Sequence, residues 1–340
     1  MSVVEARDVA QDFGLRFGRA AKVSRAPGRV NLIGEHTDYN DGFVMPAALD
    51  FATLAAFSPR ADRGIRVYSM FMDQTLEFDL DKAAPTGRHD WSDYVFGVAA
   101  MLEESGLRLK GADIVVWSDV PLGAGLSSSA ALEVSVAHAL IAASGLPFEP
   151  VAAAKICQRA ENDFVGMRCG IMDQYIAACE EGVRLLAPHL GPIAALRDVT
   201  PADLERWRGA LPDLVYRRCR HVVAENARVL EAERALKAGD FAACGAAMNA
   251  SQASMRDDFQ ITCPEIDFLA DFAQGIAGVY GSRMTGGGFG GCTVSLVEKD
   301  AVETVSKLLL DAYRVAFGLT AEIFVCSPSD GAGFVDLEKD

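Results

Sequence analysis

The spacing of apolar positions changes along the chain between short runs typical of strands and longer runs typical of helices. Residues 112–117 are apolar and partly β-branched, which predicts a strand. A glycine-containing segment follows, and an Ala-, Leu- and Val-rich run from Ser127 to Ser144 then predicts a helix that ends at Gly145. A further helix is predicted over residues 151–164. This part of the chain is therefore expected to form a strand, a glycine loop and two helices.

The second half of the chain is predicted to be mostly helical before strands return. Helix-forming residues dominate 208–273. Beyond them, strands are predicted near 278–284, 292–297 and 321–326, with a helix at 301–317. Because strands and helices mix throughout the chain, the predicted fold class is α+β.

The length and punctuation of the chain predict two lobes. Its 340 residues are half hydrophobic, which is enough for two domains that each bury a core. A Pro- and Gly-containing stretch at 187–201 is the expected boundary. We therefore predict an N-terminal lobe over residues 1–186 and a C-terminal lobe over residues 187–340.

The charge balance narrows the classes of function. The chain has 32 basic and 47 acidic residues, a formal charge of −15, and no long basic stretch. A nucleic-acid or anionic-membrane partner is therefore not expected. A polyanionic ligand must instead be held locally by backbone N–H groups, a metal ion and a few cations.

The cysteines and the N-terminus indicate a cytoplasmic protein. The eight cysteines form no C-x-x-C pair and no spacing typical of zinc ligands, so they are expected to be reduced core thiols. The N-terminus is acidic and amphipathic rather than signal-like, and no segment approaches a membrane-spanning length.

A glycine loop before the predicted helix at Ser127 has the chemistry that an anion needs. Glycines allow close backbone approach, and the first helical turn presents unpaired N–H groups with the helix dipole behind them. The loop lacks the Lys-Ser/Thr pair of a Walker A motif, and a capped strand-to-helix turn is the alternative interpretation. The serine run favours phosphate or magnesium binding, because Ser128 and Ser129 exceed what one cap needs.

A second cluster at 26–42 is unusually rich in ionisable residues for a strand end. Glu35, His36 and Asp38 offer the acceptors and the donor that could hold sugar hydroxyls. Arg29 offers a fixed positive charge to a phosphate or an attacking oxygen. A solvated polar turn is the alternative interpretation.

Five glycines lie within six positions in the stretch 283–292, between two predicted strands. They predict backbone that lies close against another loop or a ligand, with a structural turn as the alternative. Outside these stretches, Asp173 is predicted to be buried and to have a functional role, because its neighbours are apolar. Glu133 is predicted to be a surface residue, and His138 a structural histidine on an Ala-rich helix.

The three glycine-bearing stretches together resemble the three ordered motifs of the GHMP kinases. Residues 28–42, GRVNLIGEHTDYNDG, resemble the galactokinase signature in particular. The resemblance covers residues from about 25 to 297. It implies a two-lobed α+β fold with the active site in the cleft between the lobes, and a monomeric kinase that uses ATP, Mg²⁺ and galactose.

The resemblance also implies roles for single residues. Ser129 and Glu161 match magnesium ligands, Asp173 the catalytic aspartate and Arg29 the transition-state cation. Asp173 either accepts the proton of the sugar 1-hydroxyl or orients that hydroxyl while Arg29 lowers its pKa. The residues implied in ATP binding are Gly123, Ala124, Gly125, Leu126, Ser127, Ser128 and Ser129. Those implied in sugar binding are Glu35, His36, Thr37 and Asp38.

Other activities in the same superfamily remain open. Its members also phosphorylate mevalonate, homoserine, N-acetylgalactosamine and arabinose, and some galactokinase-like proteins are sugar-sensing regulators without catalysis. The intact GEHTDYNDG segment favours galactose or a near relative. The complete SSSAAL segment favours a catalyst over a regulator, because the regulators have a damaged phosphate loop.

The chain departs from the family pattern after about residue 186. Residues 182–192 run almost directly into 195–200, which resembles family sequence from beyond a region of several tens of residues. The absent region includes the tyrosine that contacts the sugar in the family. We therefore expect ATP binding to survive, galactose to bind more weakly unless Tyr39 or Tyr175 replaces that contact, and the second lobe to be mobile or to expose apolar surface.

Overall fold

The computed structural model describes residues 4–82, 90–166 and 172–338, without the side chains of residues 172–174. Two compact units divide the chain. Because both units are assembled from separated segments, this division differs from the predicted single cut between residues 186 and 187, which stays a prediction. Unit 1 consists of Met1–Arg29, Ala48–Arg168 and Cys326–Asp340, and unit 2 of Val30–Ala47 and Cys169–Val325.

A six-stranded mixed sheet forms the centre of unit 1. The predicted strand at 112–117 is confirmed as β5, which pairs parallel with β3 and antiparallel with β2. The strands follow the order β4 (Gln74–Asp79), β3 (Gly64–Ser69), β5 (Ala112–Ser118), β2 (Pro46–Pro59), β1 (Lys22–Asn31) and β8 (Gly333–Phe334).

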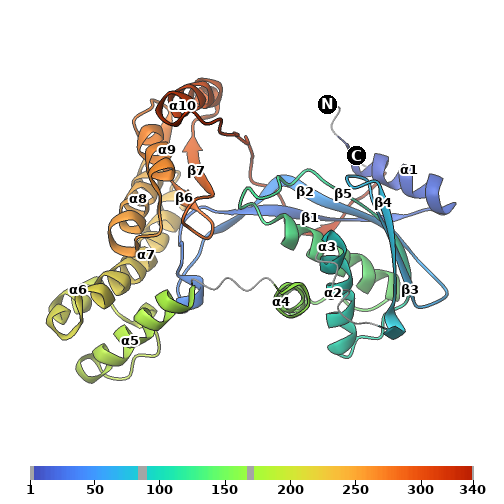
Figure 1. The fold of residues 1–340 in the computed structure, drawn as a ribbon, viewed down its shortest axis with the longest axis horizontal. Helices are drawn as coiled ribbons and strands as arrows, with labels where there is room; N and C mark the ends of the chain where they lie inside the picture. The colour runs from blue at the N-terminus through green and yellow to red at the C-terminus, as the bar shows by residue number, and fades with distance from the viewer. Residues whose placement is uncertain (1–3, 83–89, 167–171, 339–340) are drawn as a thin grey trace. The chain divides into compact units, whose positions relative to one another are not determined.

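Helices cover both faces of this sheet (Figure 1). Successive residues of a strand point to opposite faces. Accordingly, Ile114 and Val116 belong to the core under α2, α3 and α4, whereas Val115 packs with Val9 and Phe13 of α1. The helices are α1 (Ala6–Phe17), α2 (Trp91–Glu104), α3 (Ser128–Ser144) and α4 (Pro150–Arg159).

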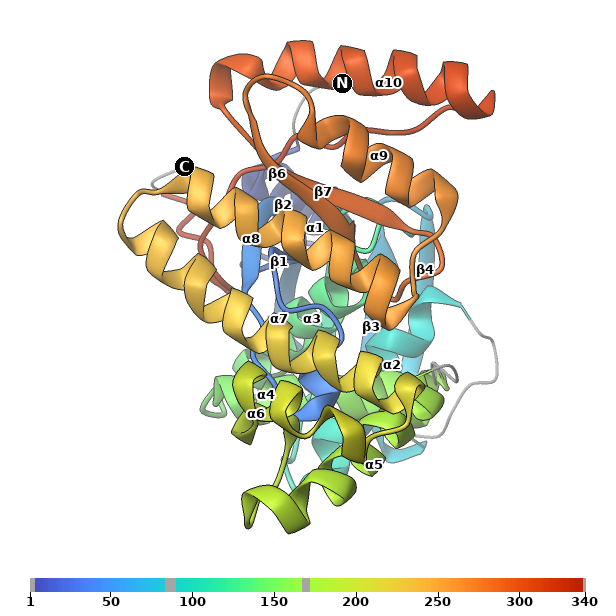
Figure 2. The same ribbon diagram turned by 90° about the vertical axis from the view of Figure 1, so that its left-hand side faces the viewer.

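Unit 2 is largely helical, as predicted, with one β-hairpin. Helix α8 lies so close to β6 that a Cβ on Gly245 would come within 2.0 Å of the Tyr280 carbonyl oxygen. Figure 2 shows α8 and α9 beside this hairpin, with α7 next to α8. The elements are α5 (Met172–Leu190), α6 (Pro201–Arg206), α7 (Asp213–Lys237), α8 (Phe241–Ser254), α9 (Pro264–Gln274), β6 (Val279–Thr285), β7 (Cys292–Val297) and α10 (Val302–Phe317).

The fold class α+β is confirmed, but the predicted strand at 321–326 is wrong. A strand needs a neighbour for its backbone hydrogen bonds, and within the described part of unit 2 the sheet contains only β6 and β7. Residues 319–325 are therefore irregular. Their apolar side chains are partly exposed, from 37% for Ile323 to 60% for Val325.

The described cysteines are free thiols, and four of them are buried, as predicted. The prediction of a core thiol is wrong for Cys326, which is exposed because it follows the irregular segment 319–325. Cys169 lies outside the described residues. None of the described helices is both long and apolar enough to cross a membrane.

Candidate active site

The predicted phosphate loop precedes α3 in unit 1. Gly123 and Gly125 have φ of +72° and +67°, a left-handed conformation that glycine adopts without steric cost. Both glycines are exposed, and the first turn of α3 contains no acidic residue. The free N–H groups of this turn and the helix dipole therefore form a site for an anion.

Three of the predicted residues lie at this loop or at the first turn of α3. The Arg29 Nη1 donates to the Gly125 carbonyl oxygen at 2.8 Å, and the Arg29 backbone N–H donates to the Leu126 carbonyl at 3.0 Å. The Ser129 hydroxyl donates to the Glu161 Oε1 at 3.0 Å. Glu161 itself lies in the π-helical turn Ala160–Val165, an irregularity often found at functional sites. Unit 1 thus brings together a cation, a hydroxyl and a carboxylate around the loop.

The prediction that Glu133 is a surface residue is wrong. Its side chain is 1% exposed, and its Oε1 has no hydrogen-bond partner. Burial raises the pKa of Glu133 to about 9, and the charge of Glu161 acts in the same direction. Helix α3 is buried on most of its surface, so it has no polar face on which Glu133 could lie. The lone carboxylate in an apolar run, without amphipathic spacing, was the available signal.

Replacing Glu133 with glutamine should stabilise the protein at alkaline pH. A carboxyl whose folded pKa lies above its ordinary 4.5 stabilises the fold below pH 4.5 and loses that contribution as the pH rises toward 9. Glutamine stays neutral, so Glu133→Gln should raise the free energy of unfolding by on the order of 3 kcal/mol at pH 8, and by nothing at pH 4. Urea unfolding without divalent metal measures this. The same gain at both pH values, or a gain of similar size in the exposed control Glu149→Gln, would contradict it.

The predicted sugar residues lie on a loop of unit 2, residues 34–43, which we call the sugar loop. Glu35 forms an ion pair with the buried Arg283 and accepts from the Gly286 N–H at 3.3 Å. The Thr37 hydroxyl contacts the carbonyl oxygens of Gly34, at 3.0 Å, and Phe43, at 2.6 Å. Both side chains therefore hold the shape of the loop.

His36 has a buried ring nitrogen without a partner, and Asp38 has an exposed side chain. The His36 Nδ1 lies 2.6 Å from the Tyr39 hydroxyl, whereas its Nε2 has no partner. Burial lowers the pKa of His36, which keeps the ring neutral. The Asp38 side chain is exposed. Of the four predicted sugar contacts, these two are the ones with free acceptors or donors.

The glycine-rich stretch between β6 and β7 lies against another loop, as predicted. The Phe289 N–H donates to the Ile261 carbonyl oxygen at 2.6 Å. A Cβ on Gly288 would approach the same oxygen to 3.0 Å and the His36 Nε2 to 3.8 Å. A side chain at Gly288 would therefore crowd Ile261, while its Cβ would meet His36 only in ordinary van der Waals contact.

Unit 2 also contains a set of buried polar residues that was not predicted from the sequence. Arg283, His221 and Glu225 are fully buried, and Asn226 is 6% exposed. A histidine and a glutamate four residues apart among valines of α7 were the available signal. The side chain of Asp173, which lies in the first turn of α5, is outside the described part of the structure.

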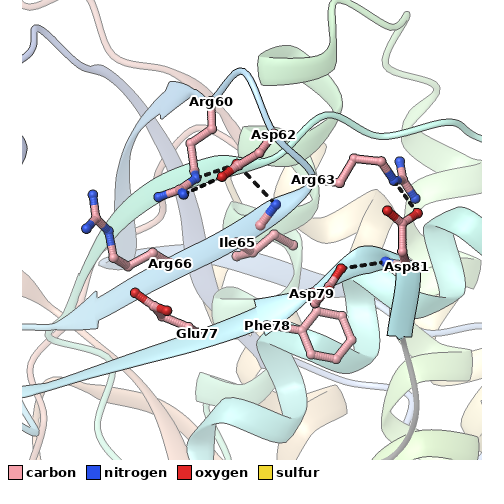
Figure 3. Close-up of a pocket in the computed structure, with 10 residues that line it drawn as sticks. Arg60, Asp62, Arg63, Ile65, Arg66, Glu77, Phe78, Asp79 and Asp81 are labelled. Atoms are coloured by element: carbon pink, nitrogen blue, oxygen red, sulfur yellow. Dashed lines mark hydrogen bonds and ion pairs between the residues drawn. The ribbon is translucent and has the colours of Figure 1, made fainter.

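A pocket of about 430 Å³ lies on the β3–β4 hairpin of unit 1, away from these motifs in sequence (Figure 3). Its side chains bind one another: Arg60 pairs with Asp62 at 2.6 Å, and Arg63 with Asp81 at 2.6 Å. Exposed pairs of this kind contribute little to stability. The pocket contains none of the predicted site residues, and Arg60, Asp62, Arg63 and Asp81 are occupied in ion pairs.

Fold and site together define a kinase of the GHMP superfamily. The sequence matches the GHMP kinases N terminal domain over residues 93–181 and the GHMP kinases C terminal domain over residues 232–314. Residues 11–59 match the galactokinase galactose-binding signature. The chain belongs to the galactokinase family.

Relatives of known sequence and structure support this assignment. A galactokinase of Roseiflexus sp. (strain RS-1) is 45% identical over 363 residues, covering 92% of this chain and 93% of the relative. A galactokinase of Chloroflexus aurantiacus is 42% identical with the same coverage. The crystal structure of Lactococcus lactis galactokinase complexed with galactose is 30% identical, with a TM-score of 0.86, covering 97% of this chain and 99% of that chain. A Methanococcus jannaschii mevalonate kinase, 17% identical with a TM-score of 0.60, shares the fold.

The alignment lengths support the predicted internal shortening. The Roseiflexus alignment spans 363 residues, whereas 92% of this 340-residue chain is about 313 residues. About 50 aligned positions therefore have no counterpart in this chain. In unit 2, residues 182–190 continue helix α5, and no strand lies between α5 and β6 in the described residues.

Proposed function

We infer that the chain transfers the γ-phosphoryl group of ATP to the anomeric 1-hydroxyl of D-galactose, giving galactose 1-phosphate and ADP. One observation supports this most strongly. Helix α3 has an intact anion-binding N-terminus with Arg29 bound to its loop, in a chain that also contains the galactose-binding signature. The complete SSSAAL segment favours a catalyst over a sugar-sensing regulator.

The Ser129–Glu161 pair is suited to Mg²⁺. Hydroxyl and carboxylate oxygens are the hard ligands that this ion takes, and it commonly keeps one or two protein ligands beside phosphate oxygens and waters. The 3.0 Å contact between Ser129 and Glu161 brings such oxygens together. When bound, Mg²⁺ neutralises charge on the transferred phosphate.

Arg29 and Asp173 are the proposed catalytic residues. Arg29 is held at the phosphate loop by its contact with Gly125, so its remaining guanidinium N–H groups can stabilise charge on the transferred group. Asp173 accepts the proton of the sugar 1-hydroxyl as that oxygen attacks phosphorus, or orients the hydroxyl for attack. His36 and Asp38 bind sugar hydroxyls, while Glu35 and Thr37 hold the sugar loop.

An ADP-release assay with a panel of sugars tests this function. MgATP with D-galactose should give turnover well above that with N-acetylgalactosamine or arabinose. Turnover with one of those sugars alone would identify a related kinase. Binding of galactose and ATP without ADP release would identify a sensor. A monomeric state, a cytoplasmic location and an active site between the lobes stay predictions.

Galactose should bind more weakly than is usual for galactokinases, while ATP binds normally. The predicted deletion after about residue 186 falls in unit 2, which contains the sugar loop, whereas the phosphate loop lies in unit 1. The partly exposed apolar side chains at 319–325 are consistent with a unit that has lost packing partners. Calorimetric titration of this chain and of the Roseiflexus galactokinase should give a galactose Kd about tenfold higher here. Equal galactose affinities would contradict the expectation and would favour a substitute contact from Tyr39 or Tyr175.

A further inference from the structure

Helix α7 directs three polar side chains at the backbone of the sugar loop. His221 and Glu225 are four residues apart and therefore share one face of the helix, and Asn226 lies beside them. Their exposed fractions are 0%, 0% and 6%. Buried polar groups stabilise a fold only when they are paired, so the partners of these side chains indicate their role.

Glu225 holds the start of the sugar loop. Its Oε1 accepts from the backbone N–H groups of Gly34, at 3.0 Å, and Glu35, at 3.2 Å, and from the Ser251 hydroxyl at 2.7 Å. Its Oε2 accepts from the Arg228 Nε at 2.7 Å. One ionised carboxylate therefore fixes two consecutive peptide groups next to His36.

His221 holds the same point of the loop from its carbonyl side. Its Nε2 lies 3.1 Å from the Glu35 carbonyl oxygen, which can only accept, so Nε2 carries the proton. Burial lowers the pKa of His221 to about 4, so the ring is neutral and Nδ1 accepts from the Ser254 hydroxyl at 2.9 Å. Glu35 is thus bound at both its N–H and its C=O by one helix.

Asn226 holds the end of the loop. Its Oδ1 accepts from the Phe43 N–H at 2.8 Å. It also lies so near Gly42 that a Cβ there would come within 2.6 Å. Two turns of α7 therefore fix the loop at residues 34–35 and again at residue 43, on either side of His36 and Asp38.

We propose that α7 positions the sugar loop for galactose, with His221, Glu225 and Asn226 as positioning residues that do not touch the sugar. The inference rests on the proposed function for the identity of the sugar. Every partner named above on the loop is a backbone group. These side chains therefore fix the positions of His36 and Asp38, and they do not contact the polar atoms with which those two residues would bind the sugar. Loss of one of them should loosen the loop and weaken sugar binding while ATP binding remains.

Two variants test the proposal at the two ends of the loop. Asn226→Ala is the milder change, because it removes only the acceptor for the Phe43 N–H. Glu225→Leu removes the acceptor for the Gly34 and Glu35 N–H groups and for the Ser251 hydroxyl, and it leaves Arg228 without its partner. Glu231→Gln, on an exposed position of the same helix, is the matched control. Hydrogen–deuterium exchange of a peptide covering residues 34–43 is measured together with KM and kcat for galactose and for ATP.

We expect faster exchange in residues 34–43 and a galactose KM raised about tenfold for Asn226→Ala, and more for Glu225→Leu if it folds. The KM for ATP should stay within twofold, and the control should match wild type. Unchanged exchange, or a rise in both KM values by the same factor, would overturn the proposal. If the wild type phosphorylates no galactose, the proposed function fails, and the exchange of residues 34–43 still decides the role of α7.

Discussion

Replacing Asp173 with asparagine should lower kcat for galactose about 100- to 10,000-fold, the range that positioned proton transfer contributes. Asparagine keeps the size of the side chain but cannot accept the proton of the sugar 1-hydroxyl. The ATP affinity, measured by calorimetry, should stay within twofold of wild type, because only an interaction of the transition state is lost.

Asp163→Asn is the matched control for Asp173→Asn. Asp163 is exposed, ten residues earlier in the chain, and loses the same charge when replaced. The control should keep wild-type turnover. A fully active Asp173→Asn variant would rule out a catalytic role for Asp173, and loss of activity in both variants would point to a general effect of charge.

Replacing Gly125 with valine should weaken ATP binding at least about 100-fold and leave galactose binding unchanged when galactose is titrated alone. Gly125 has φ of +67°, where a β-branched side chain is strained, and its carbonyl oxygen holds Arg29. The added side chain would also occupy the surface on which backbone N–H groups approach the phosphates.

Gly145→Val separates strain from ligand binding. Gly145 has φ of +70° at the opposite end of the same helix, so valine there meets the same backbone cost away from the phosphate loop. Calorimetry should show normal ATP affinity for this variant. Equal loss of ATP and galactose affinity in Gly125→Val would mean that the substitution damages the fold rather than the phosphate site.

The sequence predicted correctly those strands and helices whose formation depends on the spacing of neighbouring residues. The β-branched run at 112–117 formed β5, and the serine-to-glycine run formed α3, because strand and helix periodicity need no information from distant residues. The segment 321–326 has equally strand-like residues. It stays irregular, because a strand also needs to pair with a neighbour, and in the described part of unit 2 only β6 and β7 pair with each other.

The parts of the candidate site that consist of short motifs were predicted, whereas the residues that join the site through long-range packing were missed. The phosphate loop and the sugar loop carry dense glycines and charges, which stand out in one sequence. Glu225 and Arg283 are single charges whose burial arises from contacts across about 190 and 250 residues of chain. A local signal, such as a charged residue within an apolar run, indicates burial only weakly, because the partner that accounts for the burial lies far away in the sequence. The same limit explains the wrong prediction for Glu133.

The identity of the reaction product tests the central claim most directly. The chain is incubated with MgATP and D-galactose, and the products are identified by ³¹P NMR against authentic galactose 1-phosphate and galactose 6-phosphate. We predict stoichiometric galactose 1-phosphate and ADP, with both products forming about 100- to 10,000-fold more slowly in the Asp173→Asn variant. Inorganic phosphate alone, or phosphate on another hydroxyl, would contradict transfer to the anomeric oxygen.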